Sequence, residues 1–190
     1  MPENDPWTRM TGLRDLLLHA GEDPIREGLQ ETPRRVEDAW SERLDGYSMD
    51  PEDFLATTFE NEGGENVQLV EDIWFSSTCE HHFLPFDGYC SIAYLPQDRV
   101  VGLSKLSRLV DCFAHRLQIQ ERMTFQIADA LMQSPKLSAR GVLVVVSASH
   151  SCCTGRGVRR ERMNFVTTAR RGEISSLLKY VLISNLQRRK

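Results

Sequence analysis

The stretch from 141 to 153, GVLVVVSASHSCC, constrains the fold more than any other part of this sequence. Its first half is an unbroken apolar run rich in valine, which is typical of a buried β-strand. Three other segments also have strand-like patterns, at 67–75, 88–96 and 163–174. Pro85 and Gly88 are expected to mark a break before the second of these.

Two helices are predicted between the second and third of the four strands. Residues 103–118 and 120–132 both carry apolar residues at helical spacing, namely Leu106, Leu109, Val110, Phe113 and Leu117, then Met123, Ile127 and Leu131. Strands with helices grouped between them predict an α+β fold with a largely antiparallel sheet and paired helices.

The N-terminal part has a different character. Residues 7–20 and 31–47 are predicted to form helices, and 59–66, FENEGGEN, is expected to be a flexible connection. We therefore expect an N-terminal helical segment over 1–58 and a catalytic α+β domain over 59–190.

The bulk composition excludes several classes of protein. With 190 residues, 41% of them hydrophobic and 26% charged, the chain is suited to one globular domain. A net charge of −4 gives no reason to expect a nucleic-acid binder. No apolar run approaches the roughly 18 residues of a membrane span, and the polar start MPENDPWTRMTG is not a signal peptide. We therefore expect a cytoplasmic protein, whose five irregularly spaced cysteines serve metal binding or burial and form no disulfide framework.

The segment SSTCEHHF, at 76–83, contains a candidate metal site. Cys79 and His82 are separated by two residues, a spacing that lets both side chains reach one ion from a tight turn. If 141–153 continues as a strand, His150 and Cys152 point to the same face and Cys153 points away. Cys79, His82 and Cys152 would then hold zinc with a fourth position left for water, which is the catalytic arrangement.

The same residues have a structural interpretation. The histidines could be ordinary core residues and the cysteines simply buried. Against this, His81 and His150 would lie beside the ion, where imidazoles that titrate near neutral pH can carry protons.

Four further segments carry a family resemblance. CEHHFLPFDGYCSIAYLP, VVGLSKLSRLVD, RLQIQERMTFQIADAL and HSCCTGRGV resemble, in this order and spacing, the GTP cyclohydrolase I family. The helical entry GEDPIREGLQETPRRV is similar too, so the resemblance covers about residues 21–160. It implies a T-fold (tunnelling fold) subunit, assembled into a decamer of two pentamers with active sites at subunit interfaces.

The resemblance also implies a reaction. GTP and water would give 7,8-dihydroneopterin triphosphate and formate, the first step of pterin and tetrahydrofolate biosynthesis. Zinc would lower the pKa of its bound water, which attacks C8 of guanine, while His81 and His150 transfer protons. Ser104 is a further catalytic candidate that could bond a ribose or phosphate oxygen, although serine there could equally be a helix N-cap.

Substrate contacts follow from the same comparison. Glu121, preceded by Gln120, matches the carboxylate that reads guanine in the family, although without the resemblance it would be one exposed helix charge among many. Three basic residues match positions that bind the triphosphate in the family, namely Lys105, Arg108 and Arg156, and their cationic groups suit phosphate oxygens. Arg35 is a further candidate, contributed by a neighbouring subunit.

The chain departs from the family pattern after Arg160. Met163, Asn164 and Phe165 replace a small polar pattern, SSLLKYVLISN replaces the usual closing helix, and Cys153 follows Cys152 where methionine or valine is usual. A specialised paralogue that feeds 7-deazapurine or other secondary metabolism, or a non-catalytic T-fold scaffold, is therefore an alternative. A scaffold would need neither His81 nor His150. A zinc nucleobase deaminase is disfavoured because the H-x-E and P-C-x-x-C pair is absent.

Overall fold

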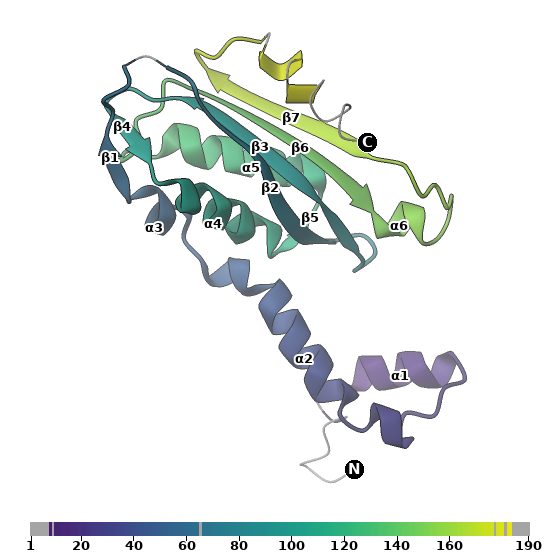
Figure 1. Cartoon of the computed structure of the whole chain (residues 1–190). Helices are drawn as coiled ribbons and strands as arrows, with labels where there is room; N and C mark the ends of the chain where they lie inside the picture. The colour runs from purple at the N-terminus through teal and green to yellow at the C-terminus, as the bar shows by residue number, and fades with distance from the viewer. Residues whose placement is uncertain (1–7, 9, 65, 177, 181, 184–190) are drawn as a thin grey trace. The chain divides into compact units, whose positions relative to one another are not determined.

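The computed structural model describes residues 8, 10–64, 66–176, 178–180 and 182–183 (Figure 1). The chain divides into two compact units, residues 1–44 and residues 45–190. Each unit is described by itself. No helix among the described residues has the length and apolar character needed to cross a membrane.

The smaller unit is helical. It consists of α1 (Thr11–His19), the 3-10 turn η2 (Glu27–Leu29) and α2 (Thr32–Arg43). Both α-helices were predicted, and both are shorter than expected. Residues 7 and 9, where the first helix was expected to begin, lie outside the described residues.

The larger unit is built on a five-stranded sheet in the order β5-β2-β3-β6-β7. All neighbouring pairs are antiparallel except β2 and β5, which pair in parallel. The strands are β2 (Gln68–Cys79), β3 (Pro85–Leu95), β5 (Leu117–Gln118), β6 (Gly141–His150) and β7 (Phe165–Gly172). A second, two-stranded sheet pairs β1 (Thr58–Glu60) with β4 (Arg99–Val101), so part of the expected flexible connection is a strand.

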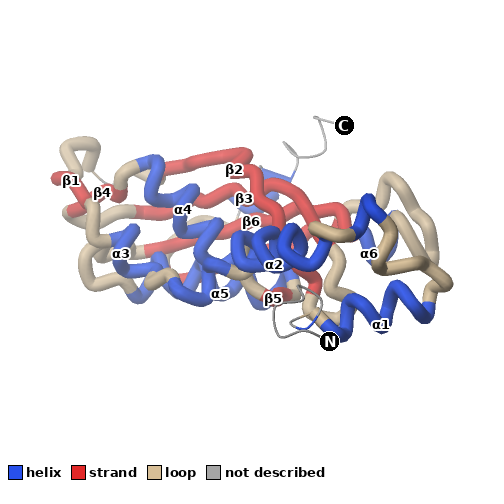
Figure 2. Tube along the Cα trace, turned by 90° about the horizontal axis from the view of Figure 1, so that it is seen from below, coloured by secondary structure: helices blue, strands red, loops and turns tan. Residues whose placement is uncertain are grey.

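Two long helices, α4 (Leu103–Ala114) and α5 (Gln120–Gln133), lie along one face of this sheet (Figures 1 and 2). Shorter helical pieces complete the unit: η3 (Asp45–Ser48), α3 (Pro51–Leu55) and α6 (Ser151–Thr154). The core lies between the two helices and the sheet. All but one of the apolar residues at helical spacing in the two predicted helices are buried there, and so are Val142, Val144 and Val146 of β6. The exception is Leu117, which is partly exposed at the start of β5. The α+β fold with a largely antiparallel sheet and paired helices is thus confirmed.

The opposite face of β6 is also buried. Leu143 and Val145 pack with Ala93, Ile174 and Leu182 in a second cluster. Part of the divergent C-terminal segment therefore covers the sheet. Its residues 177, 181 and 184–190 lie outside the described residues.

Further element boundaries in the larger unit differ from the predictions. β3 begins at Pro85 and runs through Gly88, so these residues mark no break; proline is tolerated as the first residue of a strand. The helix predicted over 103–118 ends at Ala114, because His115 leaves the helical conformation and Leu117 pairs with β2. β6 ends at His150, and Ser151 starts a one-turn helix where the strand was expected to continue.

Candidate active site

A tight turn after β2 brings the first two candidate ligands together. The carbonyl oxygen of Cys79 accepts hydrogen bonds from the N–H groups of His82 at 3.4 Å and Phe83 at 2.8 Å. Phe83 has φ of 58°, so the chain doubles back at this residue, and the N–H of Cys79 donates to Leu84 at 2.9 Å. As a result, the Nδ1 atom of His82 lies 3.8 Å from the Sγ atom of Cys79.

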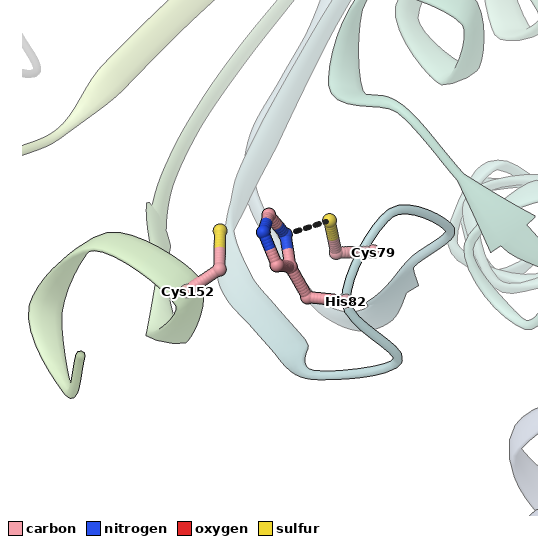
Figure 3. A group of neighbouring side chains, drawn as sticks. All are labelled: Cys79, His82 and Cys152. Atoms are coloured by element: carbon pink, nitrogen blue, oxygen red, sulfur yellow. Dashed lines mark hydrogen bonds between the residues drawn. The ribbon is translucent and has the colours of Figure 1, made fainter. Parts of the chain in front are cut away.

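The third candidate ligand follows the end of β6, which lies at the same end of the sheet as the turn after β2. β6 is paired with β3 up to Phe86 and His150, and the chain then enters α6, which carries Cys152. The ligand atoms of Cys79, His82 and Cys152 all lie within 4.8 Å of one another. Figure 3 shows the three side chains pointing into one space, from the turn and from the helix. The grouping agrees with the prediction, but the strand alternation used to reach it was wrong, because Cys152 is on a helix.

The donor set suits a soft or borderline cation such as zinc. Cys79 is buried and Cys152 is partly buried. The pKa of the Cys152 thiol is raised to about 11 by burial, by its hydrogen bond with Cys153 and by the neighbouring Cys79. A bound cation would reverse the effect on Cys152 by stabilising its thiolate.

His150 is held rigidly beside this group. Its ring stacks on Phe86 with centroids 4.6 Å apart and planes 1° apart, and the Phe165 ring packs against it edge-on at 6.2 Å. Its Nε2 atom lies 2.9 Å from the Oε1 atom of Gln120. Burial lowers the pKa of His150, and the nearby carboxylate of Glu121 opposes that shift.

A pocket of about 210 Å³ connects these residues. Its lining includes all three candidate ligands, both candidate proton-transfer histidines, and Gln120 and Glu121 at the start of α5. His81 is exposed at its edge, with its ring centroid 6.3 Å from that of His82. The remaining lining residues are Gln118, Ile119 and Phe165.

The other predicted site residues lie outside this lining. Ser104 is exposed in the first turn of α4, where Gly102 occupies the N-cap position. Lys105 and Arg108 follow on the same helix, and Arg156 is exposed just after α6. Arg35 belongs to the smaller unit, on α2.

Several contributors to the site had no clear signal in the sequence. Glu80 forms an ion pair with Arg122, which connects the turn after β2 to α5. Phe86 reaches His150 only through the register of two strands. In the sequence, Phe165 departs from the family pattern, and nothing there marks it as part of a pocket.

Comparison with known proteins places this arrangement in a family. The sequence pattern of the family described as GTP cyclohydrolase I matches residues 10–180. A solved structure of the archaeosine synthase QueF-Like in the apo form matches with a TM-score of 0.46 and 14% identity, covering 57% of this chain and 96% of that one.

Two relatives match over most of the chain. GTP cyclohydrolase 1 of Allorhizobium ampelinum is 52% identical over 165 residues, covering 86% of this chain and 81% of the relative. GTP cyclohydrolase 1 of Brucella anthropi is 50% identical over 163 residues, covering 85% of this chain and 76% of the relative. The family match and these identities agree with the four motifs and with the α+β architecture. The chain is a T-fold enzyme and belongs to the GTP cyclohydrolase I family.

Proposed function

We propose that the chain converts GTP and water into 7,8-dihydroneopterin triphosphate and formate, at a zinc ion held by Cys79, His82 and Cys152. The observation that carries this proposal is the convergence of three ligand atoms, within 4.8 Å, from segments far apart in the sequence. Two sulfurs and one ring nitrogen match a catalytic zinc site, which keeps a position open.

When bound, zinc supplies a Lewis acid and lowers the pKa of a water molecule toward neutrality. The protein's own contribution is to supply and remove protons while the imidazole ring of guanine opens and its C8 atom leaves as formate. His81 and His150 suit this task because both line the pocket beside the candidate ligands. Ser104 is proposed to contact a ribose or phosphate oxygen.

Guanine recognition is proposed to lie at the start of α5. Glu121 is in the first turn, and its carboxylate can accept hydrogen bonds from the N1–H and the exocyclic amine of guanine. Adenine does not present that pair of donors. The first N–H groups of a helix have no partner within the helix, so they can donate to the guanine O6 atom.

The triphosphate is proposed to extend beyond this pocket toward Lys105, Arg108 and Arg156. The pocket measures about 210 Å³, whereas pockets for drug-sized ligands occupy about 300–1,000 Å³. A single chain therefore encloses only part of the substrate. This supports a site completed by a neighbouring subunit, with Arg35 as a further phosphate ligand, in a decamer of two pentamers.

The cysteine chemistry supports a cytoplasmic location. All five cysteines are free, and two of them would serve as thiolate ligands, which a reducing compartment favours.

The test is to incubate purified, zinc-loaded protein with GTP and to measure formate and the pterin chromophore together. We expect both products in equal amounts. His81→Ala should keep its zinc and lose turnover, whereas Cys152→Ala should lose the metal. Absence of formate from zinc-loaded protein would refute the proposed reaction, and normal turnover by the His81 variant would refute the role given to that histidine.

A further inference from the structure

Gln120 is unusual for the first residue of a helix, because only 1% of the residue is exposed. Its Nε2 atom lies 3.1 Å from the carbonyl oxygen of Val146, 3.0 Å from that of Phe165 and 3.1 Å from the Oγ1 atom of Thr167. Its Oε1 atom lies 2.9 Å from the Nε2 atom of His150. One buried amide thus joins α5, β6, β7 and a candidate catalytic histidine.

The direction of each hydrogen bond in this network is fixed. Carbonyl oxygens only accept, so the amide nitrogen of Gln120 must face Val146 and Phe165; a flipped amide would place oxygen against oxygen. The Thr124 hydroxyl donates its one hydrogen to the main-chain carbonyl oxygen of Gln120 at 2.7 Å. The hydroxyl of Thr167, 2.7 Å from that of Thr124, must then donate to it, which leaves Thr167 free only to accept from the amide.

This arrangement determines the protonation of His150. The Oε1 atom of Gln120 can only accept, so the Nε2 atom of His150 must carry a hydrogen. We propose that Gln120 is a positioning residue that holds His150 in the tautomer protonated at Nε2, so that Nδ1 is the only ring nitrogen that exchanges protons during the reaction. The role of His150 in turnover rests on the function proposed above, whereas the tautomer itself does not.

The packing around the ring supports the same role. Phe86 stacks flat against His150 and Phe165 packs edge-on against it, so the ring cannot rotate to exchange its two nitrogens without displacing buried aromatic groups. Both ends of the Gln120 amide are engaged within the protein. The Gln120 side chain therefore acts on the substrate through His150, and only its main chain remains for a direct guanine contact.

The tautomer can be read by ¹⁵N NMR of the zinc-loaded full chain labelled at its five histidines. Spectra are recorded well above the ordinary histidine pKa of about 6.5, so that a neutral ring is observed. The His150 signals are identified by their disappearance in His150→Gln. We expect a protonated Nε2 and an unprotonated Nδ1. A ring protonated at Nδ1 would overturn the inference.

Two substitutions connect the tautomer to turnover. Gln120→Met keeps the length of the side chain but removes the acceptor, so we expect a mixture of tautomers. General acid–base catalysis contributes about 10²–10⁴-fold, so kcat should fall by about 10²-fold while KM for GTP changes little. Gln120→Glu can keep an acceptor oxygen toward His150 when its other oxygen is protonated and donates to the carbonyl oxygen of Val146 or Phe165. In that form it should restore the single tautomer and part of the lost turnover.

Thr167→Val is the matched control, since it removes a hydroxyl from the same network but leaves the Oε1 contact with His150 intact. It should keep the tautomer and most of kcat. A Gln120→Met variant that raises KM with kcat unchanged would indicate a substrate contact and refute positioning. If that variant fails to fold, the wild-type spectrum still decides the tautomer. If wild-type protein has the expected tautomer but releases no formate from GTP, the proposed reaction fails and the hydrogen-bond assignment stands.

Discussion

Gly88→Ala perturbs the strand pairing that brings the two halves of the metal site together. Gly88 in β3 pairs with Ala148 in β6. A Cβ atom at Gly88 would lie 2.1 Å from the carbonyl oxygen of Ser147 and 2.7 Å from the Cα atom of Ala148. Ordinary contacts of this kind begin near 3.4 Å, so the backbones would have to separate by about 1 Å, which is enough to break ladder hydrogen bonds.

The magnitude follows from two effects. Overpacking of this kind costs about 1–3 kcal/mol. For a chain of this size each kcal/mol lowers Tm by about 2–4 °C, so Tm should fall by about 2–12 °C. Beyond Ala148, β6 leads to His150 and then to Cys152, and metal–ligand distances tolerate only about 0.2 Å. We therefore expect zinc affinity to fall at least about tenfold, equivalent to about 1.4 kcal/mol.

The assay is a zinc titration against a competing chromophoric chelator, combined with calorimetric melting of the same preparations. Gly12→Ala is the control, because a Cβ atom there meets no heavy atom within 4 Å. It lies in α1 and should leave zinc affinity unchanged. Unchanged Tm and unchanged zinc affinity in Gly88→Ala would refute the argument that this close strand approach positions the ligands.

Two further predictions concern substrate binding and pH. Glu121→Gln removes a charged acceptor for guanine; hydrogen bonds to charged groups contribute about 1.5–3 kcal/mol, so steady-state kinetics should show kcat/KM for GTP lower by about 10–100-fold with zinc content unchanged. A normal kcat/KM would contradict the assignment. Burial raises the pKa of Asp111 above its ordinary value of 3.8, although His115 opposes the shift. The folded state thus binds the proton of Asp111 more tightly than the unfolded state does. The free energy of unfolding therefore falls as pH rises from the ordinary pKa of this carboxyl to its raised pKa in the folded protein. Asp111→Asn lacks that decline. Urea unfolding at about pH 4 and about pH 7 should therefore show the variant gaining stability relative to wild type as pH rises. An equal difference in unfolding free energy between variant and wild type at both pH values would exclude the effect.

Periodic patterns predicted the elements that form the core. The spacing of Leu106, Leu109 and Val110 identified α4, and the valine run identified β6, because burial of these side chains is what the pattern records. Element ends were less predictable. The segment SCCT could continue the strand or form one helical turn, since either conformation keeps Cys152 near His150, and the sequence does not distinguish the two.

The sequence predicted only those site residues that belong to a recognisable motif. The Cys79–His82 spacing suggested one half, and the HSCC segment, taken as a continuing strand, suggested Cys152 as its partner. The network around Gln120 was not predictable, because a glutamine at the start of a helix is ordinarily solvated and its burial depends on the register of β6 and β7. The same holds for the ion pair of Glu80 and Arg122, which joins a turn to a helix across the fold.

The central claim is that Cys79, His82 and Cys152 together hold one ion and leave it an open position. Zinc K-edge X-ray absorption on the purified protein tests this most directly, because Zn–S distances near 2.3 Å are distinct from Zn–N distances near 2.0–2.1 Å. We expect two sulfurs, one imidazole nitrogen and one further light atom at about one zinc per chain, and at most one sulfur around any zinc that Cys152→Ser retains. A shell closed by a fourth protein ligand, or two sulfurs that persist in that variant, would contradict it.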